Sequence, residues 1–178
     1  DMHKIESDKV NIHYSLRDIQ EEVFKRTSML ARGENAIRYN ELVLSRGEEF
    51  MFSPYLVDIS SELFDYISPF CKDENTGFYL SDSVNPICAD ENMAIVATKD
   101  DIEYQFALKK WFNEKSLATL DNAIFEALVN GIVWEWLSIF GESELSAKYK
   151  MMYDRAVINL RNRINSQKGP VRRKYHLF

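Results

Sequence analysis

Apolar residues at helical spacing fill much of the last third of the sequence and constrain the fold more than any other feature. From about Ser116 the series follows one helical face, and further apolar residues widen the stripe enough for a central helix. Gly141 fits a C-terminal cap. The sequence therefore predicts a long central helix whose apolar face contains Leu117, Leu120, Ile124, Phe125, Leu128, Val129, Ile132, Val133, Trp136 and Ile139.

A second amphipathic helix follows this one directly. Glu142, Ser143 and Glu144 place negative charge at the next helix N-terminus, where the helix dipole favours it. The short connection predicts that the two helices pack as an antiparallel hairpin. The apolar positions of the second helix are Leu145, Tyr149, Met152, Ala156, Leu160 and Ile164.

Two further helices are predicted in the first half of the chain. Residues 15–18 resemble a capping box, and an apolar face follows before the pattern fades at residues 32–35. Ser53 and Pro54 are typical of an N-cap followed by proline at the first helical position. We expect the helix that starts there to end at Pro69.

Between these pairs of helices the apolar period changes to two. Residues 93–97 form a short apolar run, residues 99–101 are turn material, and residues 102–109 alternate between apolar and polar. This pattern predicts a β-hairpin insertion at about residues 93–109. The alternative is a helix capped by Thr98 with Asp101 three residues later.

The fold class that these patterns predict is mainly α. We expect a bundle of about four helices with a small β-hairpin insertion, one domain over residues 1–168, and an extended tail over residues 169–178.

No apolar run approaches the roughly 18 residues that span a membrane. The N-terminal residues contain no apolar signal region. Cys71 and Cys88 are more typical of unpaired core residues in a reducing compartment than of a disulfide.

Charge is distributed unevenly along the chain. Residues 145–178 contain nine cations and one acid, a net charge of +8, although the whole chain carries −6. The remaining residues therefore carry −14. This asymmetry predicts a basic surface that meets an acidic partner, on a body that repels nucleic acid. Favourable interaction of cations with the negative end of the helix dipole accounts for Arg161, Arg163 and Lys168, but not for the cations that follow.

No residue pattern points to catalysis, a cofactor or a metal. The histidines, His3, His13 and His176, show no metal-ligand spacing, and we expect the first two to lie in a mobile segment. The six glycines are scattered singly, so no phosphate-binding loop is present. We expect a protein that is not an enzyme, with an enzyme of unrecognised class as an alternative.

Trp134 and Trp136 cannot share one helix face, so one is expected in the core and the other partly exposed.

The last ten residues are the best candidates for a functional site. Gly169 and Pro170 end the helical pattern, and cations and apolar anchors follow. Arginine offers forked donors for carboxylates or phosphates, and aromatic side chains are common anchors in interfaces. A disordered terminus is the alternative. The predicted partner-binding residues are Arg172, Arg173, Lys174, Tyr175, Leu177 and Phe178.

Residues 114–178, about a third of the chain, resemble the head–tail connector, or adaptor, proteins of tailed bacteriophages. Residues 123–165 are similar to their central helix, which ends near a tryptophan, turns, and runs into a helix with spaced Tyr, Ala, Leu and Arg. The ending G-P-V-R-R-K-Y-H-L-F resembles their basic tail. The β insertion departs from the simplest all-helical members.

The resemblance implies a structural virion protein that is assembled in the cytoplasm of the host bacterium. About twelve copies would form a homo-oligomeric ring between the portal protein and a neighbouring tail or neck protein. Genomic DNA would pass through the channel without specific binding, and no membrane or cofactor is implied. A nucleic-acid-binding or regulatory helical protein is the alternative that the +8 segment leaves open.

Overall fold

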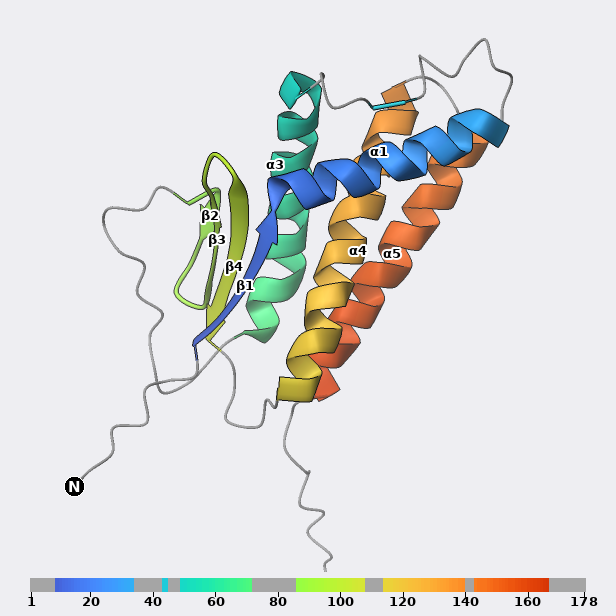
Figure 1. Ribbon diagram of the computed structural model, residues 1–178. Helices are drawn as coiled ribbons and strands as arrows, with labels where there is room; N and C mark the ends of the chain where they lie inside the picture. The colour runs from blue at the N-terminus through green and yellow to red at the C-terminus, as the bar shows by residue number, and fades with distance from the viewer. Residues whose placement is uncertain are drawn as a thin grey trace, which may run out of the picture.

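The computed structural model describes residues 9–33, 43–44, 49–71, 86–107, 114–139 and 143–166. Within these ranges the fold is mainly α with a small antiparallel sheet, which confirms the predicted fold class (Figure 1). The α-helices are α1 (Leu16–Gly33), α3 (Glu49–Ile67), α4 (Glu114–Ile139) and α5 (Ser143–Ser166). The strands are β1 (Lys9–Ser15), β2 (Cys88–Ala89), β3 (Met93–Ala97) and β4 (Asp101–Ala107).

Helix α4 is the central helix of the molecule, as its broad apolar stripe predicts. Figure 1 shows α5 running antiparallel beside it, α3 on its other side and α1 crossing over it. Residues 127–133 are buried on every side of the helix, because neighbouring helices cover it all round. None of the described helices is long and apolar enough to cross a membrane.

Gly131 sets the close approach of α3 to α4. A Cβ atom at this position would lie 2.8 Å from the Cδ1 and Cγ2 atoms of Ile59, which is fully buried. The hydrogen of glycine leaves the space that the Ile59 side chain fills. Close packing of the two helices therefore explains the glycine in the apolar stripe, although glycine lowers helix propensity.

The predicted start of the second helix at Ser53 and Pro54 is wrong. Helix α3 begins one turn earlier, at Glu49, and Pro54 lies inside it. The extra turn buries Phe52, which is 4% exposed and packs in the core, and this burial offsets the backbone hydrogen bond that proline cannot donate. The end of the helix is as expected, because a 3-10 turn, Ser68–Phe70, follows Ile67 and contains Pro69.

The predicted β-hairpin is confirmed as β3 and β4, and the alternative helix is wrong. The strands pair antiparallel, with Ile95 opposite Tyr104 and Ala97 opposite Ile102. Thr98 and Asp101, which suggested a helix cap, instead close the turn. The Asp101 N–H donates to Thr98 Oγ1 at 3.1 Å, and the Thr98 N–H donates to the Asp101 carbonyl at 2.8 Å.

The sheet is larger than the predicted hairpin, because β1 and β2 flank it in the order β1-β4-β3-β2. Strand β1 pairs with β4 along its whole length and buries Ile12 and Tyr14. The Tyr14 hydroxyl donates to the Asp121 carbonyl at 2.7 Å and so ties the strand to α4. His13 therefore lies in a strand, exposed and 3.3 Å from Asp101, and its expected place in a mobile segment is wrong. His3 lies outside the described residues.

Most predicted apolar positions of α4 and α5 are buried or half-buried, with one clear exception. Ile139 is 58% exposed, because it ends α4 where no described element covers it. Trp136 is buried and Trp134 is half-buried, as expected from their different faces. Cys71 and Cys88 do not form a disulfide with each other, which agrees with the interpretation of the cysteines.

Candidate partner-binding surface

The six residues predicted to bind a partner all lie outside the described part of the chain. They are Arg172, Arg173, Lys174, Tyr175, Leu177 and Phe178. Helix α5, which leads toward them, is described as far as Ser166. The surface of α5 is therefore the described surface nearest to them along the chain.

One side of α5 is fully turned away from the core. Its residues recur at spacings of three and four, which places them on a single helix face, and all of them are exposed. Tyr149, Tyr153 and Leu160 lie on the opposite side and are buried. We call this exposed side the α5 outer face; it consists of Lys148, Met151, Arg155, Ile158 and Asn162.

The α5 outer face combines apolar and cationic side chains. Met151 is 51% exposed and Ile158 is 54% exposed, one above the other along the helix. Among the described residues, neither Lys148 nor Arg155 makes an ion pair or a hydrogen bond through its side chain. Apolar groups between unpaired cations suit an acidic protein surface better than a phosphate backbone, which offers nothing apolar to the central pair.

Aromatic packing fixes the rotation of α5 against the body. The Trp134 and Tyr153 rings are stacked with centroids 5.7 Å apart, and Lys150 Nζ lies 4.6 Å from the Trp134 ring centroid. The Tyr153 hydroxyl donates to Glu62 Oε2 on α3 at 2.8 Å. Burial, followed by this hydrogen bond, raises the pKa of Tyr153 above its ordinary value of 10.0. The tyrosine therefore stays neutral and holds α5 to α3.

Helix α3 presents a face of opposite charge. Asp58 and Asp65 are both exposed and lie seven residues apart on one side of the helix, next to Val57, which is 43% exposed. We call this set the α3 outer face: Val57, Asp58 and Asp65.

Glu135 on α4 adds to the negative charge beside the α3 outer face. Burial, followed by the charges of Asp58 and Glu62, raises the pKa of Glu135 to about 7, from an ordinary value of 4.5. The carboxylates in this region repel one another, and a cationic partner would relieve the repulsion.

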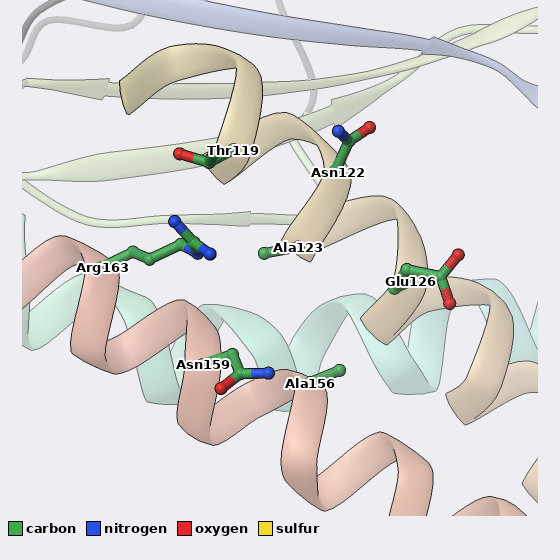
Figure 2. Close-up of a pocket in the computed structure, with 7 residues that line it drawn as sticks. All are labelled: Thr119, Asn122, Ala123, Glu126, Ala156, Asn159 and Arg163. Atoms are coloured by element: carbon green, nitrogen blue, oxygen red, sulfur yellow. The ribbon is translucent and has the colours of Figure 1, made fainter. Parts of the chain in front are cut away.

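A shallow groove of about 270 Å³ lies between α4 and α5, close to the end of α5 (Figure 2). Figure 2 shows Arg163 reaching toward it from α5 and Glu126 standing at its other end on α4. Amide and hydroxyl groups between these charges can donate to and accept from an extended peptide. The lining residues are Thr119, Asn122, Ala123, Glu126, Ala156, Asn159 and Arg163.

A polar network between α1 and α4 stabilises the body behind this groove. Arg26 donates to Asn130 Oδ1 at 2.7 Å, to Glu126 Oε1 at 2.8 Å and to Glu22 Oε1 at 3.1 Å. The network satisfies Asn130, which is 3% exposed inside the apolar stripe of α4.

Sequence reasoning also missed the α5 outer face. Met151 and Ile158 are seven residues apart and lie off the predicted apolar face, and this spacing is the signal that would have found them.

Comparisons of the chain with protein-family models, with curated proteins and with solved structures each return no match. In the described ranges, no three His, Cys, Asp or Glu side chains group together in a way that would hold a metal ion.

Proposed function

We propose that this chain is a structural subunit of a tailed-bacteriophage virion, a head–tail connector that stands between the portal and the tail. In this proposal about twelve copies form a ring in the neck of the virion, which is assembled in the cytoplasm of the host bacterium. The ring continues the DNA channel, and DNA passes without specific binding. The protein acts by docking and needs neither a cofactor nor catalysis.

The observation that carries the proposal is the separation of charge. The segment from residue 145 to residue 178 has a net charge of +8, and the rest of the chain has −14. The described part of that segment presents Lys148 and Arg155, without ion pairs among the described residues, beside exposed Met151 and Ile158. A surface of this composition supports binding to an acidic protein.

The residues that follow α5 have the main role in the proposal. Arg172, Arg173 and Lys174 pair with carboxylates of the portal, and arginine does so with two parallel hydrogen bonds. Tyr175, Leu177 and Phe178 fill apolar pockets of the same partner. Ordering this segment costs conformational entropy, and the repetition of the contact around a ring offsets the weakness of each copy.

The test replaces the three consecutive cations by alanine, R172A/R173A/K174A. Binding to rings of the portal protein encoded in the same genome is measured by co-sedimentation. We expect affinity to fall at least about tenfold, because three charge-assisted contacts are lost. The matched control, R17A/K25A/K99A, removes three exposed cations from α1 and the β3–β4 turn and leaves binding unchanged. Equal losses in both variants would contradict the proposal.

Binding to nucleic acid is the rival explanation of the basic segment. It predicts a mobility shift at low salt that weakens steeply as the salt concentration rises. We expect the proposed connector to give no mobility shift, because the net charge of −14 on the remaining residues repels the phosphates of nucleic acid.

A further inference from the structure

Two exposed helix faces of this protein carry opposite charge. Helix α3 contains four acidic residues and no lysine or arginine, a net charge of −4. Helix α5 contains five cations and two acids, a net charge of +3. Each face therefore attracts the other and repels a copy of itself.

The charged groups on the two faces also have the same spacing. Asp58 and Asp65 are seven residues apart on α3, and Lys148 and Arg155 are seven residues apart on α5. Seven residues of α-helix rise about 10.5 Å, so both pairs of groups are separated by nearly the same distance along their helices. Two ion pairs can form at once when one helix lies along the other.

Exposed apolar groups accompany the charges on both faces. Met151 and Ile158 on α5 are more than half exposed, and Val57 on α3 is 43% exposed. Contact between the faces would remove these three side chains from water. This apolar contact makes the free energy of association more favourable than exposed ion pairs alone would.

Neither set of charges is neutralised within one copy of the chain. In the part that the structure describes, Lys148, Arg155, Asp58 and Asp65 make no ion pair. Asp58 instead lies close enough to half-buried Glu135 for the two carboxylates to repel each other. A cation brought to the α3 outer face from outside would relieve that repulsion.

We propose that copies of this chain join head to tail, with the α5 outer face of one copy packed on the α3 outer face of the next. Lys148 and Arg155 pair with Asp58 and Asp65 of the neighbour, and Met151 and Ile158 pack beside Val57. A contact between two different faces is heterologous, and it generates a closed ring or a filament rather than a two-fold dimer. The inference rests on the proposed function for the closure into a ring; the contact itself is argued from the faces.

The test reverses the charge of each face separately. One variant is K148E/R155E on α5, and the other is D58K/D65K on α3. Sedimentation velocity is measured at about 100 µM protein and low salt, well above the micromolar dissociation constants of weak interfaces of standard size. Circular dichroism verifies that each variant is folded.

The expected result has three parts. The unmodified protein forms assemblies larger than a dimer, and each variant alone is monomeric because one of its two faces now repels the other. An equimolar mixture of the variants regains assemblies larger than a dimer, because the reversed α5 face of one variant is complementary to the reversed α3 face of the other, and the two unmodified faces still attract. The matched control R17E/K25E, which reverses two exposed cations on α1, assembles like the unmodified protein.

Three results would overturn the inference: an unmodified protein that is monomeric under these conditions, variants that each assemble alone, or a mixture that stays monomeric. A protein lacking residues 169–178 separates this inference from the proposed function. It keeps the head-to-tail assembly if the faces are assigned correctly, whether or not it binds the portal.

Discussion

Glu135 shows at the scale of a single residue that the acidic side of this protein carries a cost in stability. Its carboxyl group is half-buried, and burial with the charges of Asp58 and Glu62 raises its pKa to about 7. A carboxyl group whose pKa is higher in the folded state destabilises the fold once it is ionised. This cost to stability therefore appears as the pH rises from about 4.5 through 7.

Replacing Glu135 by glutamine should remove that cost. We expect E135Q to raise the free energy of unfolding by about 1 to 2 kcal/mol at pH 8, after allowance for solvent screening, and to change it little at pH 4. Urea denaturation at both pH values measures the difference. E91Q, at an exposed glutamate of the β2–β3 turn, is the control and should show no such dependence. A gain of equal size at both pH values would contradict the assigned cause.

The residues that the sequence predicted well are those decided by helical spacing alone. Trp136 and Trp134 separate into a buried and a half-buried position because two residues turn a helix by about 200°. Ile139 continues the spacing but is exposed, since spacing says nothing about where the covering elements end. The partners of Arg26 could not be predicted from the sequence, because Asn130 and Glu126 are about a hundred positions away from it.

At the scale of elements, the sheet was only half predicted. Strands β3 and β4 are adjacent in the chain and alternate clearly, so their pairing follows from local pattern. Strand β1 pairs with β4 from the other end of the chain, and its seven residues include only three alternating buried or apolar positions, Val10, Ile12 and Tyr14. Pairing of this kind is set by tertiary contacts that the local sequence does not encode.

Strand β1 gives a prediction about which N-terminal residues the fold needs. Deleting residues 1–15 removes the edge strand and uncovers β4, so we expect aggregation or a large loss of soluble protein. Deleting residues 1–8 leaves all of β1 and should give a soluble protein whose thermal stability and light scattering match those of the unmodified protein. Light scattering and thermal denaturation of the two proteins make the comparison. Equal behaviour of both deletions would mean that β1 is dispensable.

At the scale of the whole molecule, the charge separation connects the fold with the proposed function. The hairpin of α4 and α5 presents a basic, partly apolar face on an acidic body, and the chain continues from α5 into the cations at residues 168–174. The sequence predicted the helical hairpin, which the structure contains. It also predicted an extended tail over residues 169–178, which lie outside the described ranges. The exposed faces of α3 and α5 required the structure, because only the packing shows which side of each helix is left uncovered.

The most direct test of the proposed docking is site-specific photocrosslinking in assembled particles. Tyr175 is replaced by a photoreactive phenylalanine analogue, particles are irradiated, and the crosslinked partner is identified by mass spectrometry. The control carries the same analogue at Met29, an exposed position on α1. We predict that the probe at position 175 crosslinks to the portal protein and that the probe at position 29 does not. Crosslinks from position 175 only to DNA, or to no portal residue, would contradict the account.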